Sequence, residues 1–376
     1  MEKRKEGKKM KFKVMRSKFL DGLKSVQNIV AGKGSLPILQ NVMIQSVEGK
    51  IKLTTTDLDI SITSEVECEE IGEQGCTTLP VKILFTSITK AADGVIEIDV
   101  DQQNRATISA GRARFKLQGM AGEEFPKLPE EDKDFSYKVS QATIREMLRK
   151  TSYAASQDDT RRTLKGVLMS FKEMKLTMVA TDGRRLALVE KELEFPKEAE
   201  KDIVLPSKAV AEIQRSLSSE GDVEIMVQKS QVCFKLEGIK IFSKLIEDVY
   251  PNYNQVIPKE CAEHIDIDRQ LLLDALDRAS VMTMDEAHST KLTFEANVLT
   301  VSSAASEIGE VKDEVPIKYI GEKIEITFNP TYVMDPLKAI EEDEVGIGIN
   351  NSHSPVVITS KSENPFLYVL MPLKIS

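Results

Sequence analysis

The chain has 376 residues, of which 41% are hydrophobic and 30% charged, and its formal net charge is −9. Such a length exceeds what one ordinary hydrophobic core holds, so we expect two or three domains. The acidic balance argues against a protein that binds nucleic acid over its whole surface. The absence of Trp argues against a stacking platform for single-stranded nucleic acid.

The chain begins MEKRKEGKKM, which is basic but lacks the apolar stretch of a signal peptide. We therefore expect residues 1–9 to be a disordered extension, with patterned sequence starting at Met10. No apolar run approaches the roughly 18 residues of a membrane span, so we expect no membrane contact. The four cysteines form no CxxC pair, which indicates free thiols in a cytoplasmic protein: Cys68, Cys76, Cys233 and Cys261.

Three segments of the chain open in the same way, with a short strand followed by a helix that has apolar residues at i and i+4. Their separation is about 125 to 128 residues. Internal repeats of this kind indicate repeated structural units. The strand and helix positions are Val14 with Phe19 and Leu23, Val139 with Ile144 and Leu148, and Ile267 with Leu272 and Leu276.

A second helix is expected deeper in each segment, with a proline in its first turn, where the missing N–H is not needed. The three starts are Leu79-Pro80-Val81-Lys82, Leu205-Pro206-Ser207-Lys208 and Asn329-Pro330-Thr331-Tyr332. We expect these helices to end near Asp93-Gly94, Glu220-Gly221 and Asp343-Glu344. Each is followed by a strand pattern, at Val95–Val100, Val223–Val227 and Val345–Ile349.

Hairpin-like strand pairs lie between the two helices of a segment. Examples are Asn41–Val47 with Lys50–Thr55, and Gly166–Phe171 with Lys175–Ala180. Proline-rich, charged stretches at Phe125–Asp134 and Pro251–Glu263 are the expected linkers. The sequence thus predicts an α+β protein with domains at 10–128, 129–254 and 255–376, each with two helices and antiparallel strands.

Repeated domains with exposed edge strands can add edge to edge, and a repeated rotation can close into a ring. The helix Ala142–Lys150 has an apolar face, beside which Arg145 and Arg149 lie at i and i+4, with Lys150 extending the basic set. Such helices could contact a phosphate backbone, or could be ordinary solvated faces balanced by acids. Other basic positions on expected helices are Lys18, Lys24, Lys82, Lys90, Lys208, Arg215, Arg278 and Lys338.

The stretch ATDGRRLAL, at Ala180–Leu188, places Asp182-Gly183 between two strand-like runs. This dipeptide is a tight-turn signal and predicts a hairpin followed by two solvated arginines.

Catalytic motifs are missing from the sequence. We find no GxSxG, no HExxH and no complete phosphate loop, because Gly32-Lys33-Gly34-Ser35 lacks the required spacing and ending. Neither the cysteines nor the three histidines have the spacing of metal ligands. We therefore expect no catalysis, no cofactor and no metal.

Several stretches, taken together, resemble the bacterial DNA polymerase III beta subunit, the sliding clamp. They run in order from Met10 to Ser376: LPIL with Asn41, Asp57 and Asp59 in TTDLDISITSEV, EFPKL, ATDGRRLAL, YPNY, FNPTY and YVLMPL. The resemblance implies three equivalent domains per chain and a head-to-tail homodimeric ring around duplex DNA. It also implies a DNA polymerase processivity factor without catalysis of its own.

By this resemblance, replicative polymerase, clamp loader and repair proteins bind one hydrophobic cleft through short linear motifs with a Gln and two large apolar side chains. The matching positions are Leu164, Thr181, Gly183, Arg184, Arg185, Leu186, Pro251, Val256, Val369, Leu370, Met371, Pro372 and Leu373. Three positions depart from well-known members: Arg184 replaces a histidine, Gln255 replaces a residue that is often basic, and Lys374 is the last basic rim position. These changes affect the expected peptide preference.

The resemblance also implies a subunit seam and DNA contacts without sequence specificity. The seam would use Phe115 and Leu117 on an edge strand and Val281 and Met282 beside a helix of the third domain. Lys33, on the loop Gly32–Ser35, matches a family loop that meets DNA, and Arg145, Arg149 and Arg161 are further candidates for DNA contact. The alternative hypothesis is a repeat-built interaction scaffold that does not encircle DNA.

Overall fold

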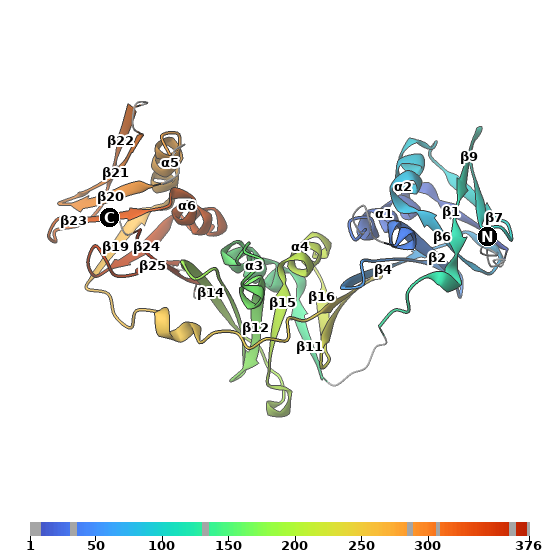
Figure 1. Ribbon diagram of the computed structural model, residues 1–376, viewed down its shortest axis with the longest axis horizontal. Coiled ribbons are helices and arrows are strands. Elements are labelled where there is room, and N and C mark those ends of the chain that lie inside the picture. Colours follow the sequence, from blue (N-terminus) through green and yellow to red (C-terminus); the bar gives the residue numbers. More distant parts are fainter. Residues whose placement is uncertain are drawn as a thin grey trace. The chain divides into compact units, whose positions relative to one another are not determined.

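The protein is described by a computed structural model that covers residues 9–30, 36–129, 135–283, 289–305, 309–360 and 366–373 (Figure 1). Within these residues the chain forms six α-helices and antiparallel β-sheets, so the predicted α+β class is confirmed. The expected disordered extension at 1–9 lies outside the described residues except for Lys9.

The first strand and helix of each segment occur where the repeat predicts them. The helix follows the strand without a gap in β1 (Met10–Met15) and α1 (Arg16–Val26), β11 (Phe135–Ser140) and α3 (Gln141–Thr151), and β19 (Glu263–Asp268) and α5 (Arg269–Ser280). The apolar i and i+4 residues are all buried, as expected for the core-facing stripe of an amphipathic helix.

The second helices are α2 (Val81–Lys90), α4 (Ser207–Ser216) and α6 (Pro330–Ala339). Only Pro330 occupies the first turn of its helix. The predicted position is wrong for Pro80 and Pro206, which end the strands β6 (Cys76–Pro80) and β15 (Lys201–Pro206). Proline suits this place because its fixed φ is also compatible with an extended strand end. All three helices end several residues before the predicted boundaries.

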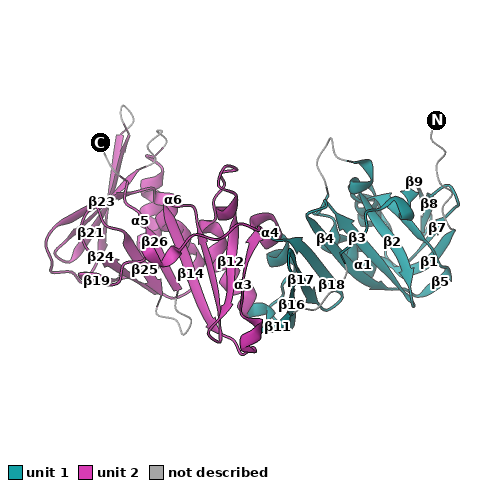
Figure 2. Ribbon diagram, turned by 60° about the horizontal axis from the view of Figure 1, so that its bottom comes forward, with its two compact units in different colours: residues 1–142, 211–245 teal, residues 143–210, 246–376 magenta. Residues whose placement is uncertain are grey.

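Two compact units divide the chain, one of residues 1–142 and 211–245 and the other of residues 143–210 and 246–376 (Figure 2). The first unit holds a five-stranded sheet in the order β5 (Glu70–Glu73), β1, β7 (Val95–Val100), β8 (Arg105–Ala110) and β9 (Ala113–Gln118). It also holds a nine-stranded sheet in the order β10 (Met120–Ala121), β6, β2 (Asn41–Val47), β3 (Lys50–Thr56), β4 (Ile60–Glu67), β18 (Ile239–Lys244), β17 (Gln231–Leu236), β16 (Asp222–Val227) and β11.

The second unit also holds two sheets. The eight-stranded sheet has the order β15, β12 (Gly166–Lys172), β13 (Lys175–Thr181), β14 (Arg185–Glu192), β26 (Phe366–Leu370), β25 (Val356–Ser360), β24 (Glu344–Ile349) and β19. The four-stranded sheet has the order β22 (Gly309–Pro316), β21 (Val298–Ala305), β20 (Thr290–Glu295) and β23 (Ile324–Phe328).

Strands from different predicted segments pair within both units. In the first unit β4 pairs with β18, with Ile62 opposite Ile241. In the second unit β14 pairs with β26, with Ala187 opposite Tyr368. The predicted edge-to-edge addition therefore occurs, and it explains why each unit joins an outer segment to part of the middle one. The predicted boundaries at 128 and 254 stay predictions.

Helices cover the sheets within each unit. In the first unit α1 packs against α2 and against β4, and a Cβ on Gly22 would lie 2.4 Å from Val66 Cγ2, so only glycine allows this close approach. In the second unit α5 packs against α6 and against β22 (Figure 1). Phe12 and Phe19 meet edge to face at 6.2 Å in the core of the first unit.

Candidate functional site

The ATDGRRLAL stretch forms the hairpin of β13 and β14, with a turn at Asp182–Arg184. Asp182 Oδ1 accepts hydrogen bonds from the backbone N–H groups of Arg184 and Arg185, at 2.8 and 3.0 Å. Gly183 has φ +86°, a conformation that glycine adopts without strain. Thr181 Oγ1 accepts from the Gly183 N–H and donates to the Arg185 carbonyl. The predicted tight turn is therefore confirmed, and it is fixed by its own side chains.

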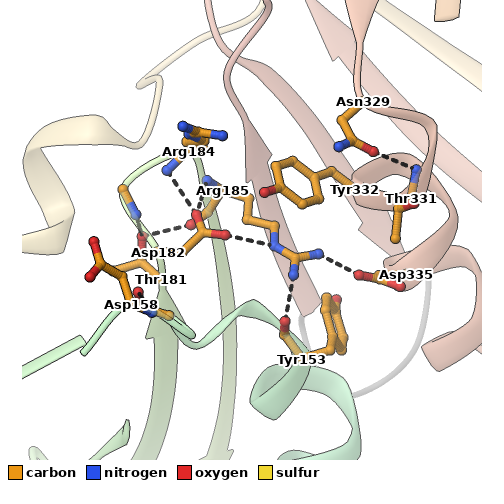
Figure 3. Close-up of polar contacts among 12 residues, drawn as sticks. Tyr153, Asp158, Thr181, Asp182, Arg184, Arg185, Asn329, Thr331, Tyr332 and Asp335 are labelled. Carbon is orange, nitrogen blue, oxygen red and sulfur yellow. Dashed lines mark hydrogen bonds and ion pairs between the residues drawn. The ribbon is translucent and has the colours of Figure 1, made fainter. Parts of the chain in front are cut away.

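The two adjacent arginines of this turn point to different surroundings (Figure 3). Arg184 is exposed, as predicted, whereas the side chain of Arg185 is only 10% exposed. Arg185 binds Asp182 through Nε at 3.1 Å, Asp335 through Nη1, and the Tyr153 carbonyl through Nη2 at 2.7 Å. The prediction that both arginines are solvated is wrong for Arg185.

Aromatic rings complete the surroundings of Arg185. Its guanidinium lies 4.2 Å from the ring centroid of Tyr332 and 5.8 Å from that of Tyr153, which are cation–π distances. Burial by itself would lower the pKa of Arg185, but Tyr368, Asp335 and Asp182 raise it above its ordinary value, so the side chain stays charged. Burial also raises the pKa of Tyr153, whose hydroxyl has no hydrogen-bond partner.

The C-terminal YVLMPL stretch lies beside this hairpin. Strand β26 pairs with β14, with Leu186 opposite Val369 and Arg185 opposite Leu370. The pairing continues past the strand, because the Met371 N–H donates to the Arg184 carbonyl at 2.9 Å. The Leu373 N–H donates to the Thr327 carbonyl at 2.8 Å. The structure thus brings together two stretches that are nearly 190 residues apart in sequence.

One face of this sheet carries an apolar cluster. Leu186 and Val369 pack with Leu168, Val179 and Val204, and side chains of the 246–257 segment cover them: Ile246, Tyr250, Tyr253 and Ile257. Within that segment Pro251 and Val256 are exposed. Leu164 is half-buried at the end of a short 3-10 turn, Arg162–Leu164.

Side chains alternate along a strand, so Arg185 and Leu370 point away from the face that holds Leu186 and Val369. Leu370 is buried, and its neighbour Tyr368 packs against Tyr153 at a ring distance of 6.0 Å. The structure therefore does not bring all of the predicted cleft residues to one surface.

An open depression of about 1690 Å³ lies in the same unit. Its wall includes four of the predicted residues, Gly183, Met371, Pro372 and Leu373. The remaining wall comes from the start of β19, from β20, from β23 and the loop before it, and from the turn before β25, with Lys291, Ile324 and His353 among its side chains. The lining therefore combines apolar side chains, such as Met371 and Leu373, with charged ones, such as Lys291 and Glu325.

The predicted DNA-contact residues lie in different surroundings. Arg145 is exposed on α3, whereas Arg149 forms an ion pair with Glu341 at 2.5 Å. Arg161 lies against the hairpin turn, where its Nη1 donates to the Asp182 carbonyl at 3.0 Å. Lys33 lies outside the described residues.

Lys150 does not extend the basic face of α3, contrary to the prediction. Its side chain is 2% exposed and its Nζ lies 2.7 Å from Glu146 Oε1. Lys150 follows the buried Met147 by three residues, and residues at this spacing share a helix face.

Part of the basic set on the helices is balanced by acids. Ion pairs join Lys18 to Glu67, Lys24 to Asp21, Arg215 to Glu212 and Arg278 to Asp313. In the part of the chain that the structure describes, no ion pair involves Lys82, Lys90, Arg145 or Lys338, and all four are exposed. The reading of solvated faces balanced by acids therefore applies to the first four residues, and phosphate contact by the basic helices stays a prediction.

The predicted seam residues lie on the edge strand of one sheet and directly after the end of one helix. Strand β9 is an edge of its five-stranded sheet, and Phe115 and Leu117 are half-buried on one side of it. In the other unit Val281 is 59% exposed just after α5, followed by the half-buried Met282.

Sequence reasoning missed Asp335, Tyr332 and Tyr153 as partners of Arg185. Tyr332 stands in FNPTY, a stretch that carries the resemblance, but nothing in the sequence pattern connects it to Arg185. Among the described residues no group of three or more His, Cys, Asp or Glu could hold a metal ion. Within the same residues no helix is long and apolar enough to cross a membrane, and the four cysteines are free thiols.

Comparison with known proteins gives a consistent result along the whole chain. Models of the N-terminal, central and C-terminal domains of the DNA polymerase III beta subunit match residues 10–129, 138–252 and 254–374. The beta sliding clamp of Chlamydia trachomatis is 30% identical over 366 residues, which cover 97% of this chain and 87% of that protein.

Two crystal structures are similar over almost the whole chain. The sliding clamp from Pseudomonas aeruginosa bound to griselimycin has a TM-score of 0.93 at 28% identity, covering 98% of this chain and 100% of that one. The sliding clamp from Bartonella birtlesii, also bound to griselimycin, has a TM-score of 0.93 at 30% identity with the same coverage.

Proposed function

Because the chain belongs to the DNA polymerase III beta subunit family, it is a non-catalytic processivity factor, and we propose that it works as a head-to-tail homodimer that encircles duplex DNA in the cytoplasm. The observation that carries this proposal is the match of all three domains, in order, to this family. A closed ring cannot leave DNA sideways, so weak phosphate contacts are sufficient and sliding remains possible.

A free sheet edge in each of the two units supports the head-to-tail dimer. Strand β9 is the last strand of its sheet, and β22 is the last strand of the four-stranded sheet in the other unit. The charged residues of β9 are both basic, Arg114 and Lys116, whereas β22 carries three acids, Glu310, Asp313 and Glu314, and one base, Lys312, which pairs with Glu314 at 2.9 Å. The opposite balance of charge on the two free edges favours their pairing in two copies. Val281 and Met282 follow α5, which packs against β22.

We propose that the exposed helix cations Lys82, Lys90, Arg145 and Lys338 contact DNA phosphates without reading bases. Arg149 is a weaker candidate, because Glu341 already balances it. Arg161 is a poorer candidate than the sequence indicates, because it is bound to the hairpin turn.

We also propose that replicative polymerase, clamp loader and repair proteins bind at the hairpin and the C-terminal strand. A short linear motif with a Gln and two large apolar side chains would use the apolar residues around Leu186 and Met371 as anchors. Exposed polar backbone and side chains around Gly183 would orient it.

Substituting Met371 by alanine is expected to weaken such a peptide about tenfold, because roughly 1.5 kcal/mol of apolar burial is lost. Met371 is half-buried, and its hydrogen bond to Arg184 uses only the backbone, so the fold is retained. Fluorescence polarisation with a labelled peptide measures the effect. The matched control is Met174→Ala, an exposed methionine in the β12–β13 turn.

Unchanged affinity of the Met371 variant would contradict the assignment of this residue to the cleft. Leu186 is a less suitable probe, because it is 2% exposed within the apolar cluster. Its truncation would also cost about 2–5 kcal/mol of stability.

A further inference from the structure

Arg184 has a fixed backbone and a free side chain. Its N–H donates to Asp182 Oδ1 at 2.8 Å and its carbonyl accepts from the Met371 N–H at 2.9 Å. The side chain is exposed, and among the described residues it has no ion pair or hydrogen bond. Figure 3 shows it directed away from Asp335, toward which its neighbour Arg185 points. A guanidinium held in this way is available to a ligand.

The acidic groups of the turn are already occupied. Asp182 is 14% exposed, with Oδ1 bound to two backbone N–H groups and Oδ2 bound to Arg185. Asp335 also binds Arg185. Neither carboxylate is therefore available to neutralise Arg184.

A second cation lies at the same turn. Arg161 Nη1 donates to the Asp182 carbonyl, and the nitrogen would lie 2.8 Å from a Cβ on Gly183. The nearest acid to Arg161 is Asp158, whose Oδ2 lies 3.9 Å from Arg161 Nε. Because Asp158 Oδ1 also accepts a hydrogen bond from the Thr160 N–H, this ion pair is weak. The solvent side of the turn is thus positively charged, although the whole chain carries a net charge of −9.

This charge lies next to the depression. Gly183, the residue before Arg184, lines it, and so does Met371, whose N–H binds the Arg184 carbonyl. A peptide anchored on these residues would pass within reach of the Arg184 side chain. A carboxylate matches the fork of a guanidinium and can accept two hydrogen bonds from it.

We propose that Arg184 is a specificity-determining residue that selects peptides carrying an Asp or Glu beside the apolar anchors. This inference rests on the proposed function of the cleft. It assigns a chemical class to the partner segment: a short, acidic, amphipathic peptide. The preference is electrostatic, so it weakens as salt screens the exposed charges.

The test uses two peptide series with the same Gln and apolar anchors, in which each non-anchor position carries Asp or Asn in turn. The full-length protein is expected to bind the Asp peptide about fivefold more tightly at one or more positions at low salt, the effect of a partly exposed ion pair. Arg184→Ala and Arg184→Gln are expected to remove this preference and to leave the Asn peptides within about twofold of their original affinity.

In the variant Arg184→His the preference for Asp over Asn peptides should depend on pH. A residue with a purely structural role would not produce this dependence. Histidine titrates near pH 6.5, so the preference for Asp should be present at about pH 5.5 and absent at about pH 8. The matched control is Arg112→Ala, an exposed arginine in the β8–β9 turn of the other unit, which should retain the preference.

The possible outcomes distinguish the role of Arg184 from the peptide-binding function of the cleft. Equal affinity for Asp and Asn at every position overturns the role of Arg184 while the cleft stands. A preference that survives Arg184→Ala but is lost in Arg161→Ala assigns the acid to Arg161 and also overturns it. Failure of both series to bind contradicts the proposed function of the cleft itself.

Discussion

Replacing Arg185 by alanine is expected to lower the free energy of unfolding by about 3–5 kcal/mol. The substitution leaves Asp182 and Asp335 as buried or half-buried carboxylates without their cation, and it empties the space between Tyr153 and Tyr332. Urea unfolding of the full chain, followed by circular dichroism at fixed protein concentration, measures the change.

The neighbouring arginine provides the matched control. Arg184→Ala removes the same side chain one residue away, at an exposed position, and should change stability by no more than about 0.5 kcal/mol. A double-mutant cycle with Asp335→Ala should show that removing both partners costs less than the sum of the single changes. Equal stability of the Arg185 and Arg184 variants would contradict the role assigned to Arg185.

These two residues also show what the sequence can and cannot predict. The Asp182-Gly183 pair predicts the hairpin because the turn is determined by local chemistry. Which arginine is buried depends on Tyr332 and Asp335, and Asp335 lies 150 residues further along the chain. No local pattern shows which of the two arginines is buried, so the sequence analysis predicts that both are solvated.

The repeat was predictable for a related reason. Apolar periodicity reports which helix residues face a core, and Phe19, Leu148 and Leu276 are all buried as expected. Periodicity does not report how a polar residue at the edge of that stripe is accommodated. Lys150 is therefore buried against Glu146 although the pattern places it on a basic face.

Introducing a charge into the proposed seam is expected to separate the two subunits. Leu117→Asp places a carboxylate on the half-buried side of the edge strand β9, and the dissociation constant of the dimer should rise on the order of 100-fold. Light scattering should then give the mass of one chain, 42.0 kDa, instead of twice that value. Processive DNA synthesis should be lost with the dimer.

The control for this variant is Val47→Asp, which adds the same charge at an exposed apolar residue at the end of β2. It should remain dimeric. Circular dichroism separates loss of assembly from loss of fold, because a seam variant keeps its secondary structure. A dimer that persists in Leu117→Asp would contradict the use of β9 in the seam.

Retention on DNA of different topology shows whether the protein encircles its template. After loading by a clamp loader onto closed circular DNA, the protein should stay bound through gel filtration at high salt, because only its ring topology holds it. Cutting the circle should release it within the same experiment, because the ring then slides off the ends. Equal retention on the circular and the cut DNA would contradict a ring that encircles its template.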